Sequence, residues 1–179
     1  MLFRSQILSY QKMLGQLQDA GNATTLAHYL KLLSGAGMLV GIDKYSGSMV
    51  RQKASSPKWQ VLNTALISAQ TVKNFSEAKA DQTWWGRLVE SAVGTQLINK
   101  SIQGRYDVLY WRDRNKEVDF VLQQGSQLIG LEIKSGIKKI ALPGMKDFIQ
   151  KFTPQKALLI GGDGIRLEDF FVSEYDYFE

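Results

Sequence analysis

The sequence has no cysteine, a single histidine (His28) and only three prolines among 179 residues. A chain without cysteine has no disulfide and no thiolate metal site, which fits a reducing, cytoplasmic location. One histidine excludes a His-rich metal site and argues against a Ser-His-Asp hydrolase. Long apolar runs are also missing, since no stretch approaches the roughly 20 residues that span a bilayer, and no signal-peptide pattern opens the chain. Any metal site must therefore be built from oxygen ligands.

The charged residues are unevenly distributed. Residues 1–80 hold nine Lys and Arg against three Asp and Glu, a net charge of +6, whereas residues 81–179 hold thirteen against fourteen, a net charge of −1. The first part can therefore approach a polyanion such as a nucleic acid. From Glu168 to the end there are five acids and no base, which predicts a solvated terminal tail.

The first 56 residues are predicted to form a small unit of two helices and a hairpin. Apolar residues recur at helical spacing over residues 3–15 and 24–37, and short strands are expected at 38–42 and 49–53. This order is typical of a winged-helix unit, whose second helix would enter a nucleic-acid groove and present Lys31 there. Pro57 interrupts the pattern, so residues 57–83 are predicted to connect this unit to a domain at 84–179.

The remaining chain predicts the order helix, strand, strand, strand, helix, strand. The helices are expected at 83–100 and 143–152, and the strands at 106–111, within 117–136 and at 156–160. Glu90 falls at the edge of the apolar stripe of the first helix, where its carboxylate can lean towards a sheet. The fold class is therefore predicted to be α+β, with an α/β core of order αβββαβ.

Residues 117–136 (EVDFVLQQGSQLIGLEIKSG) carry the most informative pattern. Gly125-Ser126 suits a two-residue type II′ turn, which fixes the register of the two flanking strands. In that register one face is wholly apolar, with the pairs Val118–Ile133, Phe120–Leu131 and Leu122–Ile129.

The opposite face of the hairpin sets Asp119 across from Glu132, with Lys134 facing Glu117. Two carboxylates at paired positions have Cβ atoms roughly 4.5–5.5 Å apart and repel one another. A shared cation would justify the arrangement, and oxygen ligands favour Mg²⁺, with Mn²⁺ as an alternative. The competing interpretation is a solvated face on which Lys134 and Glu117 pair and Asp119 has no role.

Three elements of this pattern resemble the PD-(D/E)XK, or restriction-endonuclease-like, signature. They are Glu90 on the leading helix, Asp119 on the second strand and Glu132-Ile133-Lys134 on the third, with Val118 where the nominal motif has proline. The resemblance implies a metal site made by Asp119, Glu132 and the Ile133 carbonyl.

Further roles follow if the domain is a nuclease. Glu90 would be a nearby ligand or water-orienting group, and Lys134 would position the attacking water or stabilise developing charge. The residues expected to contact phosphates are Arg112, Ser135, Lys138 and Lys139.

A second resemblance covers nearly the whole chain. The blocks SYQKMLGQLQDAGN, TTLAHYLKLLSGAG, SSPKW, WGRLVE, YWR, EVDFV and LEIKSG are similar to the C-terminal region of bacterial and archaeal AAA-type ATPases. There, a domain of unknown function follows the nucleotide-binding domain. This chain lacks the P-loop pattern GxxxxGK followed by Ser or Thr, so no ATPase activity is expected from it alone. The resemblance implies a partner, the P-loop ATPase domain of a longer protein.

These observations lead to one hypothesis and two alternatives. The hypothesis is a Mg²⁺-dependent, nuclease-like domain that acts on or binds DNA as the C-terminal part of an ATPase-family protein. The first alternative is a non-catalytic DNA-binding module that keeps the same fold. The second is a protein-interaction module that binds no nucleic acid.

Overall fold

The computed structural model describes residues 6–17, 21–48, 55–136 and 142–178. The N-terminal unit contains α1 (Tyr10–Leu14) and α2 (Ala23–Gly35) beside a small antiparallel sheet. Its strands are β1 (Gln6–Ile7), β2 (Leu39–Ile42) and β3 (Lys58–Val61), in the order β1-β3-β2. Helix α2 begins because the Asn22 side chain accepts a hydrogen bond from the Thr25 amide.

The N-terminal unit differs from its prediction at both ends. The helix expected from residue 3 begins only at Tyr10, because Gln6 and Ile7 pair with β3 and the Ser9 side chain caps the helix. The return strand expected at 49–53 lies outside the described residues. The strand that pairs with both β1 and β2 is β3, which falls within the segment predicted to be a connection.

Three helices lead from this unit into the main sheet. They are α4 (Thr64–Ser68), α5 (Phe75–Ala80) and the long helix α6 (Gln82–Gly104). Helix α5 begins with a capping box formed by Asn74 and Glu77, and α6 begins with the Asp81 side chain accepting from the Trp84 amide. The predicted helix at 83–100 is confirmed and extends for another turn.

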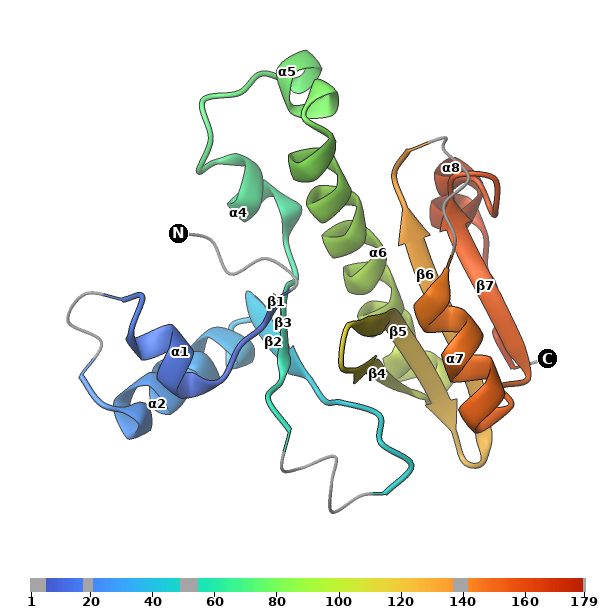
Figure 1. Ribbon diagram of the computed structural model, residues 1–179. Coiled ribbons are helices and arrows are strands. Elements are labelled where there is room, and N and C mark those ends of the chain that lie inside the picture. The colour runs from blue at the N-terminus through green and yellow to red at the C-terminus, as the bar shows by residue number, and fades with distance from the viewer. Residues whose placement is uncertain (1–5, 18–20, 49–54, 137–141, 179) are drawn as a thin grey trace.

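The main sheet has the order β4-β5-β6-β7. Its strands are β4 (Asp107–Asp113), β5 (Lys116–Gln124), β6 (Gln127–Lys134) and β7 (Lys156–Gly161). The first three are antiparallel, and β7 joins β6 in parallel through the crossover helix α7 (Pro143–Phe152). Helix α8 (Leu167–Val172) follows. Figure 1 shows α6 and α7 on either side of the sheet. The predicted α+β class and the order αβββαβ are confirmed.

Apolar side chains pack on both faces of this sheet. On the α6 side, Val93 and Leu97 contact Phe120, Leu131 and Ile133 in one cluster. A second cluster joins the other face to α7. Its buried members include Leu109, Trp111, Val118, Val121, Leu128, Met145 and Phe148. Burial of both faces explains why the central stretches of the two strands, residues 120–122 of β5 and 128–131 of β6, are continuously apolar.

The hairpin register is confirmed from the turn to Phe120, with Phe120 opposite Leu131 and Leu122 opposite Ile129. The predicted pairs Val118–Ile133 and Asp119–Glu132 are not among the paired residues of the described β5 and β6. The type II′ turn is also supported, because Gly125 has a φ of +58° whereas Ser126 is not among the described non-glycine residues with positive φ.

One expectation about the hairpin is wrong, because β5 contains a bulge. Leu109 pairs with Val121 and Trp111 pairs with Val118, so two steps along β4 match three along β5. The extra residue lies at Asp119–Phe120. Val118 therefore packs on the α7 face with Val121, instead of sharing the α6 face with Phe120.

The acidic C-terminal segment is not the solvated tail that its charge predicts. Phe170 on α8 is 1% exposed and Tyr177 is 4% exposed, and both pack in the α6-side cluster. The Tyr177 carbonyl accepts a hydrogen bond from Lys156 Nζ. Among the described residues, no helix combines the length and apolarity that a membrane crossing requires.

The N-terminal unit is joined to the main sheet along the free edge of β4. The Tyr45 amide donates to the Tyr110 carbonyl, and the Tyr110 amide donates to the Asp43 carbonyl at 3.0 Å. The Tyr110 hydroxyl donates to the Ser56 carbonyl at 2.6 Å. Burial raises the pKa of this hydroxyl to about 12, so it stays a donor across the physiological range. This seam holds the two parts together.

Candidate functional site

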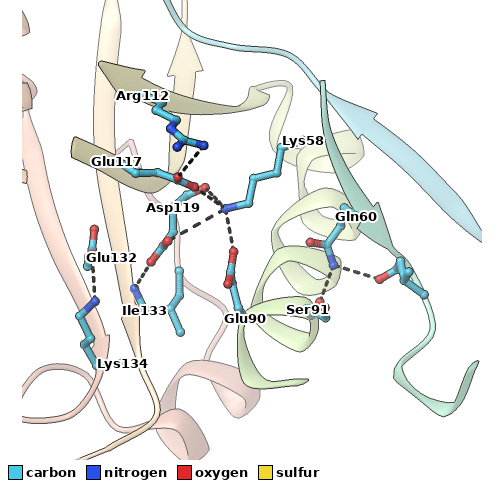
Figure 2. Close-up of polar contacts among 11 residues, drawn as sticks. Lys58, Gln60, Glu90, Ser91, Arg112, Glu117, Asp119, Glu132, Ile133 and Lys134 are labelled. Atoms are coloured by element: carbon cyan, nitrogen blue, oxygen red, sulfur yellow. Dashed lines mark hydrogen bonds and ion pairs between the residues drawn. The ribbon is translucent and has the colours of Figure 1, made fainter. Parts of the chain in front are cut away.

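A buried lysine, Lys58, lies at the centre of the strongest polar cluster. Its ammonium group is 2.7 Å from a Glu90 oxygen, 3.4 Å from Glu117 and 4.0 Å from Asp119 Oδ1. It also donates to the Asp119 backbone carbonyl at 3.1 Å. Figure 2 shows these side chains converging on Lys58 Nζ from β3, α6 and β5. We call Lys58, Glu90, Glu117 and Asp119 the buried ion cluster.

The folding of two separate parts of the chain creates this cluster. Lys58 is the first residue of β3, where it pairs with Ile7 and Ile42. Its side chain is fully buried, and its ammonium group lies 4.9 Å from the centre of the Phe120 ring. A lysine buried in this way requires compensating anions, which α6 and β5 supply.

The β5 bulge helps to position the carboxylates. By shifting the alternation of the strand, it places Glu117 and Asp119 on the side that faces Lys58, while Val118 faces α7. Asp119 Oδ2 accepts the Ile133 amide at 2.8 Å, so this carboxylate takes a hydrogen bond that would otherwise belong to the strand ladder.

One ammonium group cannot neutralise three carboxylates, and the pKa directions reflect this. Burial opposes the charged form of Lys58, but Glu90, Asp119 and Glu117 outweigh it and raise the pKa of Lys58 above its ordinary value. The pKa of Glu90 is also raised, because burial together with repulsion from Asp119 and Glu117 exceeds the attraction of Lys58. The cluster therefore holds a permanent cation and favours retaining a proton on Glu90.

Glu132 and Lys134 form a separate pair. Lys134 Nζ donates to Glu132 Oε1 at 2.8 Å, whereas Glu132 Oε2 is buried without a hydrogen-bond partner. Burial and then the charge of Asp119 raise the pKa of Glu132 to about 7. Burial lowers the pKa of Lys134, but its bond to Glu132 outweighs burial and the pKa is raised overall. Figure 2 shows this pair pointing toward one another and away from Lys58.

A cavity of about 760 Å³ opens beside the buried ion cluster. Its walls include Glu90 and Arg87 from α6, Asp119 from β5, and Lys134 and Ser135 at the end of β6, but not Glu132. Five of the residues predicted from sequence thus line one cavity, namely Glu90, Asp119, Ile133, Lys134 and Ser135, whereas Glu132 is not among its described lining residues.

The predicted metal ligands do not converge on one position for Mg²⁺. Mg²⁺ requires several oxygens around a near-octahedral centre, but Asp119 is bonded to the Ile133 amide and Glu132 to Lys134. Glu90 is occupied by Lys58. Among the described residues, no group of three or more His, Cys, Asp or Glu side chains could hold a metal ion. In this arrangement Lys58 supplies the positive charge that the carboxylates require.

The residues predicted to contact nucleic acid are spread over several surfaces. Lys31 is exposed on α2, far along the chain from the carboxylates. Arg112 is half exposed on β4, 4.0 Å from Glu117. Ser135 lines the cavity beside Asp119. Lys138 and Lys139 lie outside the described residues.

Sequence reasoning missed Lys58, which it placed only at a domain boundary. No local pattern marks this lysine, because its three carboxylate partners lie 32 to 61 residues further along the chain. The only available signal was a lysine at the start of a short strand, KWQV, that also contains Trp59 and Val61.

Comparison with known proteins identifies one similarity. Residues 85–173 match a family model described as "Domain of unknown function (DUF4143)". The match begins in α6 and ends just after α8, so it includes Glu90, Asp119, Glu132 and Lys134 but excludes β3 and Lys58. No curated protein and no solved structure matches the chain.

Proposed function

We propose that this chain is a nucleic-acid-binding module with a PD-(D/E)XK-like core, which binds DNA without cleaving it. We further propose that it serves as the C-terminal part of a P-loop ATPase-family protein. The fold supports the first proposal through the order α6, β4, β5, β6, α7, β7. Its motif residues also lie at the expected places, with Glu90 on the leading helix, Asp119 on the second strand and Glu132-Ile133-Lys134 on the third.

One observation favours binding over catalysis, namely the ammonium group of Lys58 held by Glu90, Glu117 and Asp119. Carboxylates in a metal-dependent nuclease leave a position open for the cation and its water. Here Glu90 and Asp119, two of the acidic residues of the motif, instead share the single positive charge of Lys58 with Glu117. Binding and cleavage are therefore tested together.

The test uses the full chain with fluorescently labelled single-stranded and duplex DNA and an RNA of the same sequence. We expect binding that weakens steeply with salt, with a Kd on the order of 10⁻⁶ to 10⁻⁴ M near physiological salt, as for non-specific binding. We expect no shortened products after incubation with Mg²⁺ or Mn²⁺. Failure to bind any of these nucleic acids at low salt would overturn the proposal.

Mg²⁺-dependent cleavage is the second candidate, favoured by the cavity that Glu90, Asp119, Lys134 and Ser135 share. The matched variants are Asp119→Asn and Glu132→Gln, which keep the hydrogen-bond acceptors for Ile133 and Lys134. Cleavage by the wild type that both variants abolish, with their binding retained, would establish this candidate in place of the first. Equal cleavage by all three proteins would indicate a contaminating nuclease.

A further inference from the structure

A second cavity, of about 410 Å³, lies where the N-terminal unit meets β4. We call this cavity the basic cleft, because its charged lining consists of four cations, Lys12, Lys44, Arg112 and Arg114. Ser9 and Ser56 add hydroxyl groups, and among the residues that the structure describes no Asp or Glu lines it. Four cations around one hollow repel one another in the free protein, so an anion that enters gains from all of them.

The basic cleft is formed by distant parts of the chain, and the backbone is held in place at two of its cations. Lys12 comes from α1 and Lys44 from the segment after β2, whereas Arg112 and Arg114 come from the end of β4 and its turn. Lys44 forms a bridge with Tyr110. Arg114 adopts a left-handed backbone with a φ of +53°, which is uncommon for a residue with a side chain. Cations positioned before binding lose less entropy when they engage a ligand.

The cations of the cleft are not consumed by internal ion pairs. Within the described part of the chain, Lys12, Lys44 and Arg114 take part in no salt bridge. Arg112 is 4.0 Å from Glu117, which also contacts Lys58. Asp113 is paired with Lys151, whose hydrogen bond is the main cause of its lowered pKa, and the charges of Arg114 and Lys44 lower that pKa further. Most of the positive charge is therefore available to a ligand from outside.

The shape of the cleft favours a chain of anions over a single small one. A neighbouring hollow of about 400 Å³ shares Lys44, Ser55 and Arg112 with it. Its wall also contains Lys151, paired with Asp113, so cations continue from one hollow to the next. Of the aromatic residues that line the two hollows, Tyr110, Trp111 and Tyr45 are 1%, 3% and 9% exposed, and Phe152 is half-buried. They therefore offer little surface on which a base could stack. Contacts to phosphates alone position a strand without reading its sequence.

We propose that the basic cleft binds consecutive phosphate groups of a nucleic-acid strand. This inference rests on the proposed function and adds the location of the contact, which is the seam at β4 and not the exposed face of α2. It also predicts binding with little sequence preference, because cations and hydroxyls supply the contacts.

The test compares two double variants of the full chain by fluorescence anisotropy with a labelled 20-nucleotide single strand. Lys44→Gln/Arg114→Gln removes two cations of the cleft, whereas Lys146→Gln/Arg166→Gln removes two exposed cations from α7 and the start of α8. For the first variant we expect Kd to rise by about tenfold or more, and the slope of log K against log salt to fall by about 1.4, or about 0.7 per phosphate contact. The control variant should change Kd by less than about twofold.

A third variant and two competitors separate the outcomes. The contact would lie on α2 if Lys31→Gln weakened DNA binding while Lys44→Gln/Arg114→Gln left the wild-type affinity unchanged. That result overturns this inference but leaves the proposed function standing. No binding of any DNA or RNA by the wild type would overturn both. Micromolar binding of inorganic phosphate or ATP at the cleft, without binding of the oligonucleotide, would identify a small-anion site and also overturn the inference.

Discussion

The buried ion cluster and the basic cleft are neighbouring groups of charge with opposite relations to solvent, and Glu117 lies between them. In the buried ion cluster a fully buried lysine is surrounded by three carboxylates. In the basic cleft four cations surround an open hollow, and its lining has no acid in the described part of the chain. Glu117 contacts Lys58 on one side and Arg112 on the other.

The comparison shows how burial decides what a charge can do. A charge removed from water must find its partner within the protein, so Lys58 is committed to its carboxylates. A charge that keeps its solvent can remain unpaired at little cost, so the cations of the cleft stay available. On this view the first cluster holds the fold together and the second meets the ligand.

Replacing Lys58 tests the first half of this comparison and has the largest expected effect. Lys58→Met keeps most of the apolar stem but leaves Glu90, Glu117 and Asp119 without their cation. Removing one partner of a buried ion pair costs about 3–5 kcal/mol, which urea unfolding monitored by circular dichroism would measure. Lys31→Met, at an exposed position, should change the free energy of unfolding by less than about 0.5 kcal/mol. Equal stability of the two variants would contradict the structural role of Lys58.

The next effect concerns Glu132, a buried carboxylate outside both clusters. Its folded-state pKa of about 7 lies above its ordinary value of 4.5, so between these pH values the native state binds more protons than the unfolded state. Stability contributed by this group is therefore greatest below pH 4.5 and is lost as the pH rises through 7. The loss is on the order of 3 kcal/mol.

Glu132→Gln should remove this pH dependence while keeping the bond to Lys134. The measurement is the difference in free energy of unfolding between wild type and variant from pH 5 to 8, which cancels other titrating groups. As the pH rises, the free energy of unfolding of the variant should increase relative to that of the wild type. Glu168→Gln, on an exposed side chain, should show no such trend. If the difference in free energy of unfolding between the wild type and Glu132→Gln did not change with pH, Glu132 would have an ordinary pKa.

Gly144 tests how firmly Glu117 is held between the two clusters. A Cβ at Gly144 would lie 1.9 Å from the Glu117 carbonyl oxygen, so Gly144→Ala must push α7 away from β5. Overpacking of this kind costs about 1–3 kcal/mol. The matched change Gly35→Ala meets no atom within 4 Å and should be neutral or stabilising by up to about 1 kcal/mol. Chemical denaturation of both variants provides the comparison, and a neutral Gly144→Ala would show that α7 is free to shift.

The main sheet was largely predictable because its signals are local. Gly125 specifies the hairpin turn, and the alternation on either side sets the register of Phe120 with Leu131. Pro143 marks the start of α7 where the sequence predicts it. Each of these features depends on residues that are close together along the chain.

The buried ion cluster was only half predictable, because its members meet through tertiary contacts. The motif identified Glu90 and Asp119, but nothing near Lys58 in sequence indicates that its side chain reaches them across β5. The bulge at Asp119–Phe120 is equally invisible, since it appears only when β5 is paired with β4.

For the basic cleft, the excess of positive charge in residues 1–80 covers only Lys12 and Lys44. Arg112 was predicted to contact phosphates, but Arg114 lies in the half of the chain without excess positive charge and had no signal of its own.

The smallest expected effect comes from Glu117, the residue that joins the two clusters. Glu117→Gln removes a negative charge 4.0 Å from Arg112 but keeps an oxygen that can accept from Lys58. Because the side chain is about one-third exposed, solvent screens its interaction with Arg112, and the change in stability should be below about 1 kcal/mol.

Loss of that charge frees Arg112 for a ligand, so DNA affinity should rise by about two- to threefold at 50 mM salt. The gain should shrink at 300 mM, where screening shortens the range of the charge to about 6 Å. Anisotropy titrations at the two salt concentrations measure this, with Glu168→Gln as a control for loss of an acid elsewhere on the surface. Weaker binding by Glu117→Gln would mean that Glu117 positions Arg112 for the ligand and does not compete with it. The cluster and the cleft would then act as one site, because the carboxylate that helps to neutralise Lys58 would also orient the cation that meets the phosphate.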